Sequence, residues 1–159
     1  MIKGFITNLG KYNEGILMGE WITFPIDDEE LEKVLKRIGI NEEYEEVFFT
    51  DWESDIDINA GEYEDIETMN ELAERLESAD GEKIEAIMEA TGYCLSEALD
   101  CEEDAVWYPG MTLEEVAEEI VNDCYNLPDF ALRYFDYEAF ARDLSFDGYT
   151  ETYNGVIYI

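Results

Sequence analysis

Residues 122–144 read NDCYNLPDFALRYFDYEAFARDL, and this stretch gathers six aromatic side chains in a chain otherwise crowded with carboxylates. Leu127-Pro128 is expected to end the helix before it, because proline cannot continue one. Asp129 and Asp136 are placed to cap or open short helices. Residues 136–144 should then bury one apolar stripe. Two interpretations stay open: a local core beneath the C-terminal strands, or a subunit contact in addition, since the aromatics exceed what a small core needs.

Net charge is the unusual property of this chain. Its 159 residues hold 42 Asp and Glu against nine Lys and Arg, with no histidine, for a formal net charge of −33. Residues 1–53 carry 13 acids and five bases, residues 54–103 carry 17 acids and two bases, and residues 104–159 carry 12 acids and two bases. The net charges of these three segments are therefore −8, −15 and −10. Two windows, 38–74 and 84–132, contain no base. Such charge opposes compaction through self-repulsion, so we expect a functional reason for it and a positively charged partner.

The composition excludes several classes of protein. Without histidine, Ser-His and Cys-His catalysis and every histidine-bearing zinc site are excluded. Paired carboxylates could still hydrolyse glycosides, but among 42 acids close pairs arise by chance, and we expect no enzyme. The segment 55–61, DIDINAG, is similar to a calcium loop, yet its glycine comes one place late and Ile66 stands where a bidentate Glu belongs. We therefore expect no dedicated metal site and no cofactor.

Cysteine number and hydropathy bear on location. Cys94, Cys101 and Cys124 are odd in number and form no CxxC pair, which is typical of reduced thiols in a cytoplasmic protein. No apolar run approaches the ~20 residues of a membrane span, and no signal peptide opens the chain. A strongly acidic surface also repels nucleic acid and anionic lipid. Neither nucleic acid nor membrane is expected as a partner.

Hydrophobic periodicity predicts an α+β fold whose first part is a β-β-α-β unit at residues 1–53. Strands are predicted at 1–8, 16–24 and 46–52, with a turn at 10–15. The helix between the last two strands is capped by Asp27 or Asp28 and stopped by Gly39.

The rest of the chain is predicted to form two further domains. Residues 54–103 form an acidic helical domain, with a loop at 54–64 and amphipathic helices at 65–78 and 82–91. Residues 104–159 form a mixed α/β domain that ends in a hairpin. It is predicted to contain a strand at 104–108 and a helix that begins at the capping box from Thr112 to Glu115. The turn dipeptide Asn154-Gly155 predicts the hairpin.

Acidity of this density has three explanations that the composition leaves open. B-DNA carries one charge per ~1.7 Å of axis, so 33 charges correspond to roughly 55 Å of duplex. A rigid carboxylate surface could therefore occupy the groove of a DNA-binding protein as a decoy. A halophilic surface is also rich in acids and poor in lysine. An acidic adaptor or chaperone for some other basic protein is the third explanation.

Both ends of the chain resemble a known family. Residues 6–15, ITNLGKYNEG, followed by Gly19-Glu20-Trp21, are similar to the opening of the ArdA antirestriction proteins. Leu127-Pro128-Asp129, continuing to residues 134–144, is similar to that family's antirestriction motif and the residues after it, and Asn154-Gly155 before a final strand is similar too. The residues that carry the motif are Leu127, Pro128, Asp129, Tyr134, Phe135 and Asp136.

The resemblance implies a non-catalytic, dimeric mimic of bent B-DNA, elongated and built from three small domains in a row. Such a protein occupies the DNA-binding groove of type I restriction-modification enzymes and blocks cleavage, and also modification, of incoming mobile DNA. The alternative is an acidic binding module for another basic DNA-binding or histone-like protein.

We predict the mimic surface from the outward acids of the two windows without bases. These acids are Glu42, Glu43, Asp55, Asp57, Glu67, Glu71, Glu74, Glu114, Glu115, Glu118 and Glu119. The family resemblance points to the C-terminal domain for the contact between two copies, and the candidates there are Trp107, Tyr108, Met111 and Phe130. Ordinary core packing is the alternative role for each of these four.

Overall fold

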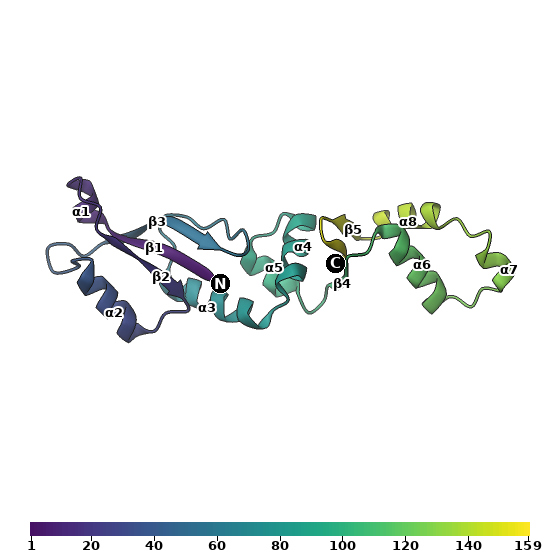
Figure 1. Ribbon diagram of the computed structural model, residues 1–159, viewed down its shortest axis with the longest axis horizontal. Coiled ribbons are helices and arrows are strands. Elements are labelled where there is room, and N and C mark those ends of the chain that lie inside the picture. Colours follow the sequence, from purple (N-terminus) through teal and green to yellow (C-terminus); the bar gives the residue numbers. More distant parts are fainter. The chain divides into compact units, whose positions relative to one another are not determined.

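The computed structural model describes residues 1–159, and they form an α+β fold in two compact units. The first unit is Met1–Ala79 and the second is Asp80–Ile159 (Figure 1). Each unit holds one small antiparallel sheet and its own buried residues. The predicted fold class is confirmed, whereas the division into three domains stays a prediction.

The first unit is built around β1 (Ile2–Asn8), the central strand of a sheet with the order β2-β1-β3. β2 (Gly19–Phe24) and β3 (Val47–Ser54) both run antiparallel to β1. α2 (Asp28–Arg37) begins at the predicted cap, where Asp27 accepts a hydrogen bond from the Glu30 N–H at 2.8 Å. The β-β-α-β order expected from the sequence is thus present.

The connection between β1 and β2 differs from the prediction. α1 (Leu9–Asn13) occupies the segment predicted as a turn, because the Asn8 side chain accepts a hydrogen bond from the Lys11 N–H at 2.9 Å and starts a helix there. β2 begins at Gly19 instead of residue 16. Ile16 and Leu17 consequently lie in the loop before the strand, where they are exposed.

α3 (Ile66–Ser78) packs within the first unit. Met69 and Ala73 are buried, and Asn70 holds the backbone of Ile26 from two sides. The Ile26 N–H donates to Asn70 Oδ1 at 2.8 Å, and Asn70 Nδ2 donates to the Ile26 carbonyl at 2.9 Å. Because these contacts fix the rotation of the helix, its acids are left facing solvent.

Gly4 of β1 has no room for a side chain. A Cβ at this position would lie 2.7 Å from Cδ1 of Phe49 and 2.9 Å from Cζ3 of Trp52, whose ring centroids are 4.4 Å apart. We expect Gly4→Val to lower the free energy of unfolding by about 2 kcal/mol or more, because the two rings would have to separate. Denaturant unfolding measures this change.

Gly61→Ala is the matched control for Gly4→Val. A Cβ at Gly61 would meet only the end of the Glu64 side chain, at 3.3 Å, so a change within about 0.5 kcal/mol is expected. Equal unfolding midpoints for Gly4→Val and the unsubstituted chain would show that the rings accommodate the new side chain.

The second unit begins with α4 (Gly81–Thr91) and α5 (Leu95–Cys101) and contains a sheet with the order β4-β6-β5. Its strands are β4 (Val106–Pro109), β5 (Tyr149–Thr152) and β6 (Gly155–Tyr158). The β5–β6 hairpin turns at Asn154-Gly155, as predicted. The strand predicted at 104–108 begins two residues later and ends one residue later, because β4 follows the register that pairs Val106 with Tyr158.

Three helices complete the second unit: α6 (Leu113–Cys124), α7 (Asp129–Leu132) and α8 (Tyr137–Phe146). α6 and α8 pack against each other around Ala117, Ala141 and Leu144. The short helix α7 connects them and lies at the end of this pair that is farthest from the sheet (Figure 1). The helix caps predicted at Thr112 and Asp136 are both present.

Candidate functional site

The acids of α6 form the densest part of the predicted mimic surface. Val116, Ala117 and Val121 are buried, so the helix turns its other face outward. That face carries four exposed carboxylates, those of Glu114, Glu115, Glu118 and Glu119. Residues 114–119 span ~8 Å of helix axis. One carboxylate per ~2 Å is close to the ~1.7 Å per charge of B-DNA.

Glu115 differs from its neighbours because it is part of the capping box of α6. Its Oε2 accepts hydrogen bonds from the Thr112 N–H at 2.8 Å and from the Thr112 hydroxyl at 3.0 Å, while the Glu115 N–H donates to Thr112 Oγ1 at 3.3 Å. The backbone and hydroxyl hydrogen bonds from Thr112 lower the pKa of Glu115. This carboxylate therefore stabilises the start of the helix as well as adding to the acidic surface.

We expect the contribution of Glu115 to stability to depend on pH. Its pKa is lower in the folded chain than in the unfolded chain, so the carboxylate stabilises the fold above the unfolded value of ~4.3. That stabilisation is lost as the pH falls through the lower, folded-state pKa. Glu115→Ala should lower the melting temperature at neutral pH, and the difference from the unsubstituted chain should narrow below pH ~4.

Glu118→Ala is the control for this pH dependence, because Glu118 is exposed on the same helix and belongs to no cap. In melting curves across a pH series, Glu118→Ala should show no comparable fall in melting temperature at neutral pH. A loss for Glu115→Ala that stays constant down to low pH would contradict an electrostatic role for the cap.

The remaining acids predicted for the mimic surface lie in the first unit, and all of them are exposed. Glu67, Glu71 and Glu74 share the outward face of α3, opposite its buried residues. Glu42 and Glu43 lie in the loop between α2 and β3, and Asp57 lies in the loop after β3. The roles of these side chains in recognition stay a prediction.

Asp55 is set apart from the other acids by a partner. Its Oδ2 lies 2.7 Å from the α-amino group of Met1, and the hydrogen bond to this cation lowers the pKa of Asp55. The charge of Asp55 is therefore partly neutralised inside the first unit. Its contribution to an acidic surface is smaller than the sequence alone predicts.

The lysines of the first unit form ion pairs. Lys33 pairs with Glu29 at 2.8 Å and Lys36 with Glu32 at 2.7 Å along α2. Lys3 pairs with Glu53 at 2.9 Å across β1 and β3. The predicted mimic surface does not include α2, because this helix contains bases and lies outside the two windows without bases.

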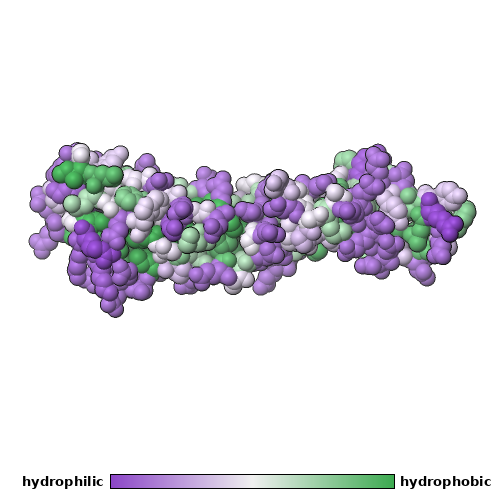
Figure 2. Space-filling view, in the orientation of Figure 1, coloured by the Kyte–Doolittle hydropathy of each residue, from purple (hydrophilic) through white to green (hydrophobic).

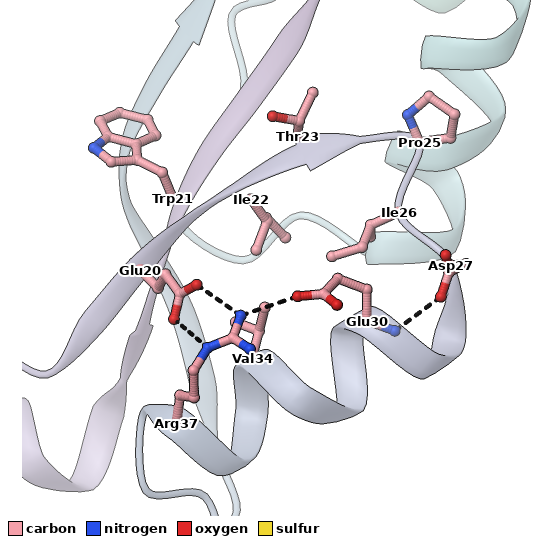
Figure 3. A pocket seen from close by; sticks show the side chains of 10 residues that line it. All are labelled: Glu20, Trp21, Ile22, Thr23, Pro25, Ile26, Asp27, Glu30, Val34 and Arg37. Atoms are coloured by element: carbon pink, nitrogen blue, oxygen red, sulfur yellow. Dashed lines mark hydrogen bonds and ion pairs between the residues drawn. The ribbon is translucent and has the colours of Figure 1, made fainter.

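Arg37 joins α2 to β2 at the edge of an open pocket of about 250 Å³ (Figure 3). Its Nε and one terminal nitrogen donate to the two carboxylate oxygens of Glu20 at 2.9 and 2.7 Å, and the same terminal nitrogen donates to Glu30 at 3.0 Å. These bonds lower the pKa of Glu20 and raise that of Arg37. Through these bonds Arg37 connects β2 to α2 and engages both carboxylates within the chain.

The stretch 122–144 divides into an exposed half and a packed half. Tyr125, Phe130 and Tyr134 are 55%, 75% and 77% exposed, and we call these three residues the aromatic tip. The Phe130 and Tyr134 ring centroids lie 5.3 Å apart. The chain around them, residues 125–134, contains one acid, Asp129, and one base, Arg133. The aromatic tip is therefore an apolar surface of zero net charge.

The packed half begins at Phe135, whose ring lies 4.9 Å from Tyr137 and 5.8 Å from Phe140. Phe140 packs against the buried cluster between α6 and α8. Asp136 starts α8 by accepting a hydrogen bond from the Ala139 N–H at 2.9 Å. The local-core interpretation thus describes this half, and it does not describe the aromatic tip.

The four candidates for a contact between copies fall into different environments. Trp107, Tyr108 and Met111 are half-buried in and after β4, and the Tyr108 ring lies 6.3 Å from Tyr149 of β5. Phe130 alone among the four is largely exposed. Tyr125 and Tyr134 are exposed as well, although the sequence did not put them forward as candidates. Neither side chain belongs to the apolar stripe at helical spacing in α8, and this pattern could have predicted that both are exposed.

The six motif residues gather around α7. Leu127 and Phe135 are half-buried, whereas Pro128, Asp129, Tyr134 and Asp136 are exposed. Pro128 directly precedes the first residue of α7, and Asp129 opens that helix as predicted. The motif therefore builds the connection that carries the aromatic tip.

No three Cys, Asp or Glu side chains come together in a way that could hold a metal ion. None of the helices has the length and apolarity needed to cross a membrane.

The model of the antirestriction protein (ArdA) family matches residues 4–158, which is nearly the whole chain. The match includes the segment between the two ends that resemble this family in sequence. No curated protein matches the chain.

Proposed function

Since the chain belongs to the ArdA antirestriction family, we propose that it is a non-catalytic mimic of bent B-DNA that binds in the DNA groove of type I restriction-modification enzymes. By filling the groove it blocks cleavage of incoming mobile DNA, and modification as well. The observation that carries this proposal is the exposure of every acid predicted for the mimic surface.

The charge on α3 and α6 supports mimicry of a phosphate backbone. Proteins hold DNA mainly through Lys and Arg placed against phosphates. The outer faces of these helices carry carboxylates at a linear density similar to that of DNA phosphates. The Lys and Arg side chains of a DNA-binding protein can pair with these carboxylates as they pair with phosphates. Both helices are held by buried residues of their own unit, so the carboxylates require little ordering on binding.

The expected inhibition is competitive and stoichiometric. Many exposed and partly screened contacts share the binding energy, so no single carboxylate is essential. The affinity should fall as the salt concentration rises, as it does for DNA itself.

We further propose that the aromatic tip joins two copies of the chain. Two proteins of charge −33 repel each other, and an uncharged surface is where they can approach at the lowest cost. The tip combines zero net charge with three exposed aromatic rings, which are the side chains enriched in protein interfaces. A homodimer through the second unit is therefore part of the proposed function.

Competition for DNA tests the proposed function. A type I methyltransferase core is bound to a labelled target duplex, and this protein is titrated in at two salt concentrations. We expect release of the duplex near one dimer per enzyme, together with a directly observed protein–enzyme complex. Polyglutamate at an equal concentration of charge is the control, and it should release far less DNA. If the folded dimer left the duplex bound, an acidic module for another basic protein would replace the proposal.

A further inference from the structure

Two arginines of the second unit have no acidic partner within the chain. The lysines of the first unit and Arg37 all pair with carboxylates. Arg133 and Arg142 are exposed and form no ion pair, although the chain holds 42 acids. Arg133 is the more informative of the two, because it follows the last residue of α7 and stands next to Tyr134 of the aromatic tip.

α7 carries one acid and one base at the spacing of one helical turn. Asp129 is the first residue of this helix, and Arg133, directly after its last residue, keeps a helical backbone conformation with φ −66° and ψ −18°. Residues four apart lie on the same side of a helix, about 6 Å apart along its axis. Both side chains are exposed, and they do not pair with each other. Each is therefore accessible to a partner outside the chain.

The rings of the aromatic tip repeat this spacing. Phe130 and Tyr134 are also four residues apart, and their ring centroids lie 5.3 Å from each other. Figure 2 shows hydrophobic (green) and strongly hydrophilic (purple) atoms close together over the end of the unit where Figure 1 places α7. An acid and a base in this order along a helix are complementary to the same helix in the reverse direction.

From this arrangement we propose that two copies of the chain pack α7 against α7 in antiparallel orientation, with Asp129 of each copy paired to Arg133 of the partner subunit. This inference rests on the proposed homodimer and names the polar contacts that close it. In a two-fold contact, residue i meets residue j and residue j meets residue i. The antiparallel arrangement satisfies this condition for the two charges, and it also sets Phe130 opposite Tyr134 of the partner subunit.

The two ion pairs would offset the repulsion between the copies where the copies are closest. Charges farther apart than ~8 Å are largely screened at physiological salt, so the groups at the contact matter more than the total charge of −33. The pairs would also fix the direction of packing. Aromatic rings alone accept either direction, whereas a parallel arrangement would set Asp129 against the same residue of the second copy, and like charges across a contact disfavour it.

Two charge-reversed variants test the pairing between copies. Arg133→Asp has two acids on α7, and Asp129→Arg has two bases there. Alone, each variant would place like charges at both contacts, so we expect its dimer dissociation constant to rise about 100-fold or more. In a 1:1 mixture, each acid of one variant faces a base of the other. The mixed dimer should therefore recover to within about tenfold of the unsubstituted dimer.

Light scattering coupled to size exclusion measures the masses, with a tag on one variant to identify the mixed dimer. Mixing separates contacts between copies from contacts within one chain, because an ion pair inside the chain could not be restored by a second variant. Asp129→Arg also separates pairing from net charge. It brings the charge of each copy from −33 to −31, so reduced repulsion alone would strengthen the dimer.

Arg142→Asp and Asp123→Arg are the matched controls. They make the same two changes of charge at exposed residues of α8 and α6. Both should remain dimers, and a mixture of Arg133→Asp with Asp123→Arg should not recover the mixed dimer. All four substituted side chains are exposed, and melting curves verify that each variant folds.

Three results would overturn the inference while the homodimer stands. They are full-mass dimers of both α7 variants alone, a mixture of these variants that stays monomeric, and dissociation of the controls to the same degree. A monomeric unsubstituted chain is a separate result, and it would refute the proposed homodimer itself.

Discussion

Reversing four exposed carboxylates at once, in Glu67→Lys/Glu71→Lys/Glu114→Lys/Glu118→Lys, is expected to weaken DNA competition by about 100-fold or more. Each change removes an attraction to a basic groove and adds a repulsion in its place. The slope of inhibition against log salt should fall too, because fewer charged contacts remain. The competition assay at several salt concentrations measures both effects, and any one of the four changes alone should cost only a few-fold.

The choice of these four acids follows from the structure. All are exposed on α3 or α6, and none of them caps its helix. Asp55 and Glu115 are left out because the α-amino group and Thr112 already bind them. Their substitution would confuse a loss of stability with a loss of recognition.

The matched control carries the same change in charge outside the predicted mimic surface. It reverses four other exposed acids of the second unit: Glu138, Asp143, Asp147 and Glu151. We expect this control to lose much less activity in the competition assay. If the two quadruple variants were equally weak, net charge would be responsible, and if both inhibited normally the assigned surface would be wrong.

Phe130→Asp is expected to convert a dimer into a monomer of 18.4 kDa. Phe130 is 75% exposed in the single chain, so the substitution leaves the core of the unit unchanged. In a dimer through the aromatic tip the new carboxylate would be buried without a partner, next to a second copy that is itself strongly acidic. Light scattering coupled to size exclusion measures the mass.

Two further variants make the mass measurement decisive. Phe146→Asp adds the same charge at a phenylalanine that is 81% exposed and belongs to α8, and it should leave the dimer intact. Tyr134→Asp should dissociate the dimer as Phe130→Asp does. A full-mass dimer in both tip variants would exclude the aromatic tip as the contact and return attention to Trp107 and Tyr108.

Local signals in the sequence were good guides to the helices and turns. Asp27, Thr112 and Asp136 each accept the hydrogen bond expected of a helix cap. Asn154-Gly155 turns the last hairpin. These caps and turns depend on atoms within about four residues of one another, so they can be predicted without knowledge of the rest of the fold. Asn8 is the exception. It caps α1, a role that was not predicted from the sequence, and a helix therefore forms where a turn was predicted.

The sequence by itself determined the charge of this protein, its outward carboxylates and the order of its elements apart from α1, since these follow from residue type and hydrophobic period. The tertiary structure decided which charges are bound and which aromatic rings are exposed. Asp55 meets an amino group that is 54 residues away in the chain, and Phe135 packs where Phe130 does not. Such outcomes depend on contacts between distant segments, and neither composition nor periodicity encodes those contacts locally.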